Sequence, residues 1–378
     1  MRIETKPGAA HNAFDPRPLA RKAAAVFALL ALSALCSCSS SKTRFGYVAT
    51  GQGVFAFRMD GGTGAASQIF GSPFVAKTNA SFGAASASSV IVHPSNKFLY
   101  VADQDIDSIS LFDIDSTTGA LTEVQPRTAL TTSAGGAGLS PAVLTMDSSG
   151  QFLFVANQAT NDVWVFSIGP SGALTFVSSA QLAAAPGGLT LSASGNLLYV
   201  PVPAVSAVYV FGVNGGTLTQ VGTPFIVSGG VGTLAVDPGG NFLYVPNPSA
   251  DTVTVLRIQS DGSLTFGSGA FATGLTPTAA ATNPTGAYLY VANFGATNLS
   301  QYQVDSASGT LTPLTTATAS TGTQPLSILI DPDAKFAFVV NQQSRSVTEF
   351  TFNSNGTLGT TNNALQLNVE PRSFSITK

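Results

Sequence analysis

The sequence is poor in cysteine, histidine and charge. Its 378 residues include two cysteines, two histidines and one tryptophan, and only 9% of them are charged. Both cysteines lie within the first 38 residues, so the rest of the chain has no disulfide framework and no cysteine metal site. With 16 basic and 19 acidic residues, the chain lacks the electrostatic footprint of a protein that binds nucleic acid or anionic lipid headgroups.

Familiar catalytic motifs are missing as well. The sequence contains no GxSxG, no HExxH, no CxxC and no phosphate-binding loop. We therefore expect no metal site and no cofactor. What the sequence does have is 38 glycines and many short β-branched and aromatic runs, a composition typical of an exported all-β protein and not of a disordered one.

The N-terminal segment has the pattern of an export signal. Arg21 and Lys22 are followed by the uncharged run 23–35, AAAVFALLALSAL. At about 1.5 Å per residue this run is too short to cross a hydrocarbon core of roughly 30 Å. It is therefore interpreted as the apolar core of a signal peptide that is removed during export.

Both cysteines lie where such a signal would be cleaved. Leu35-Cys36-Ser37-Cys38 resembles the bacterial lipobox, a resemblance that implies lipidation of Cys38 and removal of residues 1–37. Residues 38–43 would then be a short polar tether, and residues 44–378 the folded domain. The alternative is an ordinary secretory signal in which both cysteines are incidental. Removing residues 1–37 takes away five of the 16 basic and two of the 19 acidic residues, which leaves a net charge of −6.

One short pattern recurs along the whole domain. The stretch FLYVPN at 242–247 has counterparts such as FLYVAD, FLFVAN and YLYVAN. The aromatic residue at the third place of each copy is Tyr47, Tyr100, Phe154, Tyr199, Tyr244, Tyr290 and Phe338. Seven copies of about 48 residues match the size of four-stranded propeller blades. The expected fold is therefore an all-β, seven-bladed β-propeller.

Strands and turns can be assigned within a copy. In the fifth copy LAVD, NFLYVPN, TVTVLRI and SLTFG have the alternation and length of four strands, separated by turns such as Asp237-Pro238-Gly239-Gly240. The first copy lacks its first strand, and residues 371–377 at the other end of the chain align with 325–331. We therefore expect the C-terminal strand to complete the first blade and close the ring, which removes open sheet edges.

These repeats carry a resemblance to a known family. The D-P-x-G turns followed by FLYVAN-like strands resemble the YVTN-type repeats of the seven-bladed lactonase family, which includes proteins similar to 6-phosphogluconolactonase and carboxymuconate cyclase. The resemblance covers the whole mature chain and implies the propeller fold and a site for lactone chemistry. Trp164 is the only tryptophan and no WD dipeptide closes a blade, which disfavours the WD40 class.

Arg372 is the best single candidate for a functional residue at the channel mouth. The equivalent positions at the starts of the seven innermost strands hold Ser88, Ala142, Gly187, Gly232, Thr278, Leu326 and Arg372. Only Arg372 is charged, and its guanidinium is suited to a carboxylate or phosphate. The alternative is a structural ion pair with Glu370 or another acid.

Polar residues follow the second strand of most copies. The equivalent positions there are Thr50, Asp103, Asn157, Val202, Asn247, Asn293 and Asn341. The four asparagines are candidate ligand-binding residues, although asparagine in such loops often caps its own backbone instead. Asp103, with Asp105 and Asp107, is the only cluster with enough carboxylates to suggest a cation site, and solvated acids are the simpler interpretation.

The family's usual catalytic residues are not carried over. Where lactonase-type propellers have a histidine, this chain has Pro141-Ala142-Val143, and Asn157 stands where an aspartate is common. His93, the only histidine after the signal, occupies a turn position and not the mouth.

Two functions remain open. The first is a lipid-anchored propeller of the cell envelope that binds a small molecule or a protein at its mouth and has a degenerate catalytic site. The second is a lactone hydrolase or cyclase that uses Arg372, Glu370 and Asp103. In either case we expect a monomer that binds no nucleic acid and contacts the membrane only through its lipid.

Overall fold

The computed structural model describes residues 1–2, 43–76, 85–131, 136, 138–331, 333–361 and 363–378. The chain divides into two units, Met1–Lys42 and Thr43–Lys378, and the described strands all lie in the second. The predicted signal peptide and Cys38, with almost all of the predicted tether, fall outside the described residues. Within the described part of the chain, no helix has the length and hydrophobicity needed to span a bilayer.

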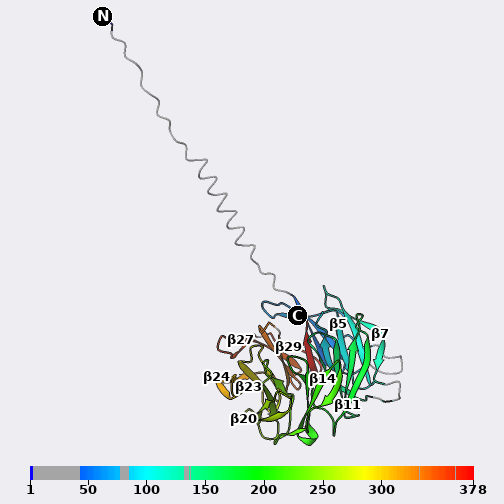
Figure 1. Cartoon of the computed structure of the whole chain (residues 1–378). Coiled ribbons are helices and arrows are strands. Elements are labelled where there is room, and N and C mark those ends of the chain that lie inside the picture. The colour runs from blue at the N-terminus through cyan, green and yellow to red at the C-terminus, as the bar shows by residue number, and fades with distance from the viewer. Residues whose placement is uncertain (3–42, 77–84, 132–135, 137, 332, 362) are drawn as a thin grey trace. The chain divides into compact units, whose positions relative to one another are not determined.

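The second unit is a seven-bladed β-propeller, which confirms the predicted fold (Figure 1). Blade 1 consists of β30 (Pro371–Ile376), β1 (Arg44–Thr50), β2 (Gly53–Met59) and β3 (Ala66–Gln68). Blade 2 consists of β4 (Ala87–Val92), β5 (Phe98–Asp103), β6 (Ser108–Ile114) and β7 (Leu121–Ala129). Blade 3 consists of β8 (Pro141–Met146), β9 (Phe152–Asn157), β10 (Asp162–Ile168) and β11 (Leu174–Gln181).

The remaining four blades follow the same order. Blade 4 consists of β12 (Thr190–Leu191), β13 (Leu197–Val202), η1 (Pro203–Val205), β14 (Ala207–Asn214), β15 (Thr217–Gln220) and the extra strand β16 (Phe225–Ile226). Blade 5 consists of β17 (Ala235–Val236), β18 (Phe242–Asn247), β19 (Thr252–Ile258) and β20 (Leu264–Ala272). Blade 6 consists of β21 (Pro277–Thr282), β22 (Tyr288–Asn293), β23 (Asn298–Val304) and β24 (Leu311–Ser320). Blade 7 consists of β25 (Pro325–Ile330), β26 (Phe336–Asn341), β27 (Ser346–Phe352), β28 (Leu358–Thr360) and the extra strand β29 (Leu365–Gln366).

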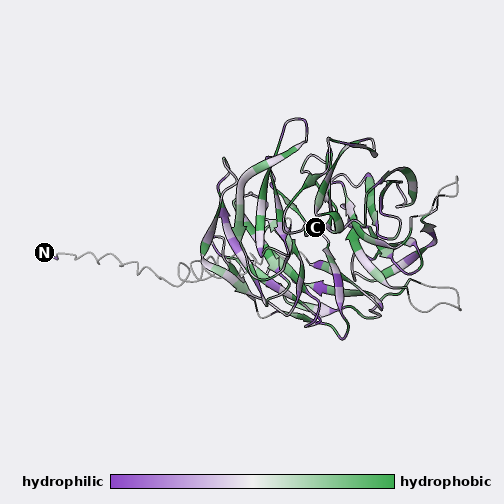
Figure 2. Ribbon diagram, turned by 90° about the horizontal axis from the view of Figure 1, so that it is seen from below, coloured by the Kyte–Doolittle hydropathy of each residue, from purple (hydrophilic) through white to green (hydrophobic). Residues whose placement is uncertain are grey.

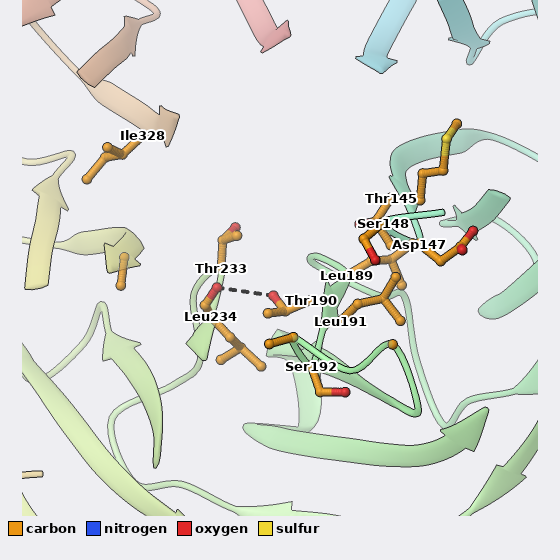
Figure 3. Close-up of a pocket in the computed structure, with 14 residues that line it drawn as sticks. Thr145, Asp147, Ser148, Leu189, Thr190, Leu191, Ser192, Thr233, Leu234 and Ile328 are labelled. Atoms are coloured by element: carbon orange, nitrogen blue, oxygen red, sulfur yellow. Dashed lines mark hydrogen bonds between the residues drawn. The ribbon is translucent and has the colours of Figure 1, made fainter. Parts of the chain in front are cut away.

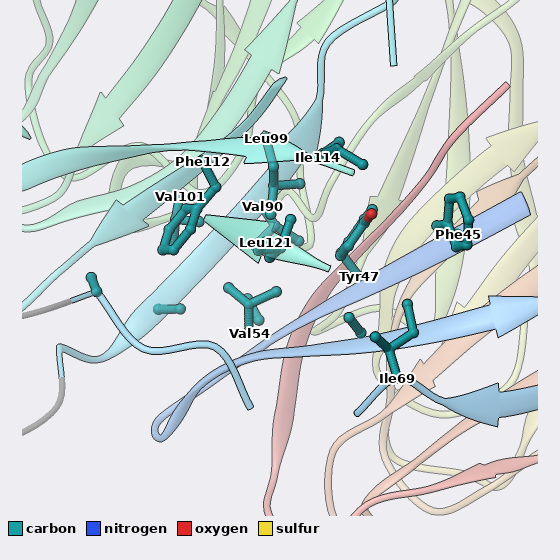
Figure 4. Close-up of a cluster of buried hydrophobic side chains, with 14 of the residues drawn as sticks. Phe45, Tyr47, Val54, Ile69, Val90, Leu99, Val101, Phe112, Ile114 and Leu121 are labelled. Atoms are coloured by element: carbon teal, nitrogen blue, oxygen red, sulfur yellow. The ribbon is translucent and has the colours of Figure 1, made fainter. Parts of the chain in front are cut away.

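The first strand of each blade lies innermost, and each contacts the first strand of the next blade around the ring. The ring closes as predicted, because β30 pairs antiparallel with β1, with Tyr47 opposite Ser375 and Val48 opposite Phe374. Figure 4 shows this red C-terminal strand running beside the blue N-terminal hairpin. The two ends of the domain therefore share one sheet.

The hydrophobic core is divided among the interfaces between neighbouring blades. In one such cluster Phe45, Tyr47 and Val54 of blade 1 pack against Leu99 and Phe112 of blade 2 (Figure 4). The ribbon coloured by hydropathy shows hydrophobic segments recurring around the ring and not in a single central layer (Figure 2). Each blade is thus stabilised by its neighbours, as in other repeat architectures.

The recurring tyrosine and glycine of the sequence meet across these interfaces. The hydroxyl of Tyr100 in one blade donates a hydrogen bond to the Gly172 carbonyl of the next, at 2.8 Å, and Tyr47 and Tyr290 make the corresponding bonds in their blades. Gly172 has a φ of +81°, and a Cβ there would lie 3.1 Å from the Phe98 ring. The turn therefore needs glycine both for its left-handed backbone and for the close approach of the neighbouring blade.

Blades 4 and 5 depart from the regular pattern. Their inner strands, β12 and β17, contain two residues each, whereas those of the other blades contain six. Gly187 and Gly232 donate their N–H groups to the carbonyls of Pro201 and Pro246. Proline has no N–H group and cannot donate a second hydrogen bond back to the inner strand. The backbone pairing between the second strand and the inner strand is therefore interrupted at this point.

Candidate functional site

Arg372 lies at the start of β30, at one end of the central channel. Its Nη1 donates a 2.6 Å hydrogen bond to Ser86 Oγ, and its Nη2 lies 3.7 Å from the place that a Cβ on Gly51 would occupy. Among the described residues, no carboxylate lies within ion-pair distance of this guanidinium. The expected alternative, a pair with Glu370, is not formed, and Glu370 is exposed. The side chain is half-buried and keeps donors for a ligand.

In blades 2 and 3 the rim near Arg372 is built by backbone pairing of two loops. Gln104 N–H donates to the Ser86 carbonyl in blade 2, and Gln158 N–H donates to the Ser140 carbonyl in blade 3. The Gln104 side chain then bridges these blades, because its Nε2 lies 3.0 Å from Ser140 Oγ and 3.4 Å from Gln158 Oε1. Polar side chains thus line the rim on one side of Arg372.

The opposite part of the rim is apolar. At the loop position equivalent to Gln104 the seven blades carry Gly51, Gln104, Gln158, Pro203, Pro248, Phe294 and Gln342. The glutamines belong to blades 7 and 2, which flank blade 1 and its Arg372, and to blade 3 beside blade 2, whereas the prolines and the phenylalanine belong to blades 4 to 6. At this loop position the residues are therefore polar in blades 7, 2 and 3 and apolar in blades 4 to 6.

Asp103, predicted as a partner of Arg372, points elsewhere. Its side chain is 1% exposed and accepts a 2.5 Å hydrogen bond from Ser110 of β6, inside its own blade. Burial raises the pKa of this carboxyl to about 7, although the Ser110 hydroxyl and the charge of Arg127 lower it. No hydrogen bond or ion pair joins Asp103 or Glu370 to Arg372 in the described residues, so the structure does not bring the three proposed catalytic groups together.

The four asparagines are fully buried at the ends of the second strands. Asn293 donates to Asn298 Oδ1 at 2.7 Å and accepts from Gly274 N–H, while Asn247 accepts from Thr254 Oγ1 at 2.6 Å and donates to the Gly230 carbonyl. Asn157 and Asn341 are likewise bonded within their blades or to the adjoining loop. These contacts are the loop capping that the alternative interpretation described, and a ligand-binding role for these residues stays a prediction.

Two further groups singled out in the sequence have local structural partners. Asp105 accepts from Ser86 N–H at 2.8 Å and Asp107 accepts from Ser140 N–H at 2.7 Å, so the acids near Asp103 bind different loops. His93 lies in a turn, with Nδ1 2.8 Å from Ser95 Oγ and Nε2 3.0 Å from the Gly150 carbonyl. No group of three metal-ligating side chains occurs among the described residues.

One feature was not predicted. A cavity of about 420 Å³ occupies the channel, lined mainly by blades 3 and 4 (Figure 3). Threonine hydroxyls from several blades face it, including those of Thr145, Thr190 and Thr233. Pro201 and Pro246 interrupt the repeat in blades 4 and 5, but neither of them lines this space.

The fold is a seven-bladed propeller with one arginine, Arg372, among the seven equivalent positions at one end of its channel. The family description "Lactonase, 7-bladed beta-propeller" matches residues 40–180, 126–231 and 227–320, and the chain therefore belongs to this family. The comparison with curated proteins finds no match.

Solved structures share the architecture at low sequence identity. A Pseudomonas aeruginosa periplasmic gluconolactonase, PpgL, superposes with a TM-score of 0.72 at 20% identity over 89% of this chain and 99% of its own. A Bacteroides fragilis protein proposed to be a 6-phosphogluconolactonase gives 0.73 at 20% identity over 90% and 99%. Hydrazine synthase of Kuenenia stuttgartiensis gives 0.55 at 15% identity over 81% and 92%, so the same fold serves unrelated chemistry.

Proposed function

We propose that this lactonase-family propeller binds an anionic small molecule at its channel mouth through Arg372 and does not turn it over. The observation that carries the proposal is the half-buried Arg372 guanidinium, which has one hydrogen bond to Ser86 and no carboxylate partner among the described residues. A partly desolvated guanidinium favours a carboxylate or phosphate that can accept two of its N–H groups.

The rim extends this recognition. Gln104 and Gln158 offer amide groups beside the cation, and these suit hydroxyl or carbonyl groups of the ligand. Pro203, Pro248 and Phe294 offer apolar contacts on the other side. The ligand class is therefore an anion with a polar segment next to the charge and a less polar remainder.

We expect no turnover, because the candidate bases do not lie beside the cation. Asp103 is buried and bonded to Ser110, Glu370 is exposed without a described contact to Arg372, and the family's histidine position holds Ala142. A general base must come within hydrogen-bond reach of the water that it activates. Neither acid has that placement beside the guanidinium.

Lactone hydrolysis is the second candidate function. Membership in the lactonase family favours it, as does the pKa of Asp103 near 7, which suits a general base at neutral pH. This mechanism requires the loops of blade 2 to open and expose Asp103.

Binding and hydrolysis should be measured on the same protein. The probes are 6-phosphogluconate in calorimetric titration and δ-gluconolactone with 6-phosphogluconolactone in a pH-stat. Arg372→Gln should weaken 6-phosphogluconate binding by roughly tenfold or more, since a hydrogen bond to a charged group contributes about 1.5–3 kcal/mol. Arg345→Gln is the matched control, because Arg345 is an exposed arginine in a loop of blade 7 whose side chain makes only a 3.5 Å contact with the Asn368 carbonyl.

The outcomes separate the candidates. Binding that is lost in Arg372→Gln and kept in Arg345→Gln, without lactone consumption, supports the binding function. Lactone consumption that depends on Arg372 and Asp103 would instead support the hydrolase function. Equal binding of 6-phosphogluconate by both arginine variants would overturn Arg372 as the binding site.

We also propose that the protein is exported and attached to the cell envelope through lipid on Cys38. Support comes from the basic and apolar N-terminal pattern and from the lipobox-like LCSC sequence. The fold neighbour from Pseudomonas aeruginosa is described as periplasmic.

A further inference from the structure

Hydroxyl groups tie most neighbouring inner strands together along the channel. Ser375 Oγ of blade 1 accepts from Val92 N–H of blade 2 at 3.0 Å, and Ser89 Oγ of blade 2 accepts from Leu144 N–H of blade 3 at 3.2 Å. Further bonds run from Thr190 to the Leu234 carbonyl, from Thr282 to the Val236 carbonyl and from Thr278 to the Pro325 carbonyl. Blades 1 to 3 and blades 4 to 7 thus form two connected series.

The described residues make no such bond between the inner strands of blades 3 and 4, or between those of blades 7 and 1. The channel cavity of about 420 Å³ lies at the seam between blades 3 and 4, with Thr145 and Ser148 on the blade 3 side and Thr190 and Ser192 on the blade 4 side (Figure 3). The short strand β12 and the turn that follows it supply the blade 4 side of the lining.

The lining of the cavity keeps unused hydrogen-bonding groups. Within the described chain, the hydroxyls of Thr145, Ser148 and Thr233 have no protein partner, whereas Thr190 donates to the Leu234 carbonyl at 3.1 Å. Each unused hydroxyl offers one donor and two acceptor sites. Leu189, Leu191, Leu234 and Ile328 supply apolar walls between them.

Charge does not dominate this cavity. No lysine, arginine or histidine lines it, and its one carboxylate, Asp147, already accepts hydrogen bonds from the N–H groups of Ser149 and Phe152 in its own turn. A phosphate or carboxylate would therefore enter without a counter-charge, at a desolvation cost that nothing offsets. The lining favours an uncharged molecule with several hydroxyl groups.

We propose that this cavity is a second ligand site, which binds an uncharged polyol the size of a monosaccharide. Its volume falls within the range of about 300–1,000 Å³ typical of small-molecule sites and gives room for on the order of ten heavy atoms. The ligand's hydroxyls would bond Thr145 of blade 3 and Thr233 of blade 5, and its ring would lie against the leucine side chains. The site is distinct from Arg372, which is absent from the cavity lining.

The test compares three probes that share one ring. Ligand-observed NMR titrations would use myo-inositol, cyclohexanol and myo-inositol 1-phosphate with the folded domain, residues 44–378, in its Arg372→Gln form, so that the phosphate is not held at the mouth. We expect saturable binding of myo-inositol and weaker binding of the other two, because cyclohexanol has only one hydroxyl and the phosphate carries charge.

Substitutions locate the binding. Thr145→Val with Thr233→Val removes two hydroxyls while keeping the branched shape, and should weaken myo-inositol binding by about tenfold, as two hydrogen bonds of ordinary strength predict. Thr318→Val, at an exposed position of the outer strand β24, is the matched control and should bind like the wild type. Arg372→Gln should also leave myo-inositol binding unchanged, which separates this site from the mouth.

Each contrary result has a definite meaning. No saturable binding of myo-inositol would show that the cavity holds water only and would overturn the proposal. Equal binding by the double valine variant, or loss of binding in Arg372→Gln, would place the polyol elsewhere and overturn it as well.

Discussion

Arg44 and Asp331 form a buried ion pair, 2.5 Å between Nη1 and Oδ2, across 287 residues of sequence. Arg44 begins β1, and Asp331 lies in the turn after β25, so the pair joins the first blade to the last. Arg44 also contacts Asp333, whose side chain is 58% exposed. The ring closure thus combines β-strand pairing in blade 1 with this ion pair between blades 1 and 7.

Breaking the buried ion pair between Arg44 and Asp331 should destabilise the domain. Asp331→Asn leaves the Arg44 charge without its buried partner, and removal of one member of such a pair costs about 3–5 kcal/mol. Asp333→Asn, at the exposed position, should cost less than about 1 kcal/mol. Urea unfolding of both variants measures the difference, and equal losses would contradict the assigned role of the buried pair.

Deletion of residues 371–378 should unfold the whole ring and not merely shorten it. The deletion removes β30, leaves the inner edge of β1 unpaired and exposes Val48, which packs near Phe374 in the core. The expected result is loss of the cooperative thermal transition in calorimetry. Deletion of Lys378 alone, which removes only the exposed contacts with Asn96, is the control and should retain the transition.

Two tyrosine substitutions should have different effects on stability. Tyr100→Phe removes the 2.8 Å bond to Gly172 and should cost about 1 kcal/mol in free energy of unfolding. Tyr199→Phe should cost nothing or add slightly to stability, because the buried Tyr199 hydroxyl has no hydrogen-bond partner within the described residues. Denaturant titrations on the two variants give the comparison, and a larger loss for Tyr199→Phe would contradict it.

Asp103→Asn should stabilise the protein increasingly as the pH rises. Burial raises the pKa of Asp103 from 3.8 to about 7, so between these values the unfolded chain releases a proton that the folded chain retains. Stability contributed by this residue therefore falls across that window, and asparagine, which does not titrate, avoids the loss.

The gain from Asp103→Asn should be absent near pH 4 and level off above pH 7. The pKa change sets an upper limit on the order of 4 kcal/mol. Asn293 accommodates the same position in blade 6, with Ser300 in the place of Ser110, so the substitution fits the fold. The free energy of unfolding of the wild type and of Asp103→Asn should be measured at pH 4.5 and at pH 8. A gain in stability that does not depend on pH would contradict the raised pKa of Asp103.

Cys38→Ala should abolish membrane attachment if the lipobox is used. We expect the wild type to partition into the Triton X-114 detergent phase and to incorporate labelled palmitate, and the variant to do neither. Cys36→Ala should remain lipidated, because Leu35 before it does not fit the lipobox. Retention of label in Cys38→Ala would refute lipidation at this cysteine.

Much of the architecture follows from the sequence because the repeat is local. Each copy carries its own alternation, its turn glycine and its aromatic residue, and these features need only neighbouring residues to specify strands and hairpins. The alignment of residues 371–377 with 325–331 was likewise sufficient to predict the closing strand, which β30 confirms. The short inner strands of blades 4 and 5 were not predicted. A proline interrupts the pairing with the inner strand only where the N–H group that it lacks would face that strand, and the sequence of Pro201 and Pro246 does not show this direction.

The sequence by itself determined the number of blades, the strand order and the place of Arg372 as the single charge among seven equivalent positions. Only the tertiary structure decided which polar groups reach the mouth: Asp103 and the four asparagines turn into their own blades, whereas Arg372 stays without an acidic partner among the described residues. It also decided that a cavity opens between blades 3 and 4. The physical reason is that side-chain direction, burial and spacing at the axis depend on packing between blades about 50 residues apart, which no local pattern records.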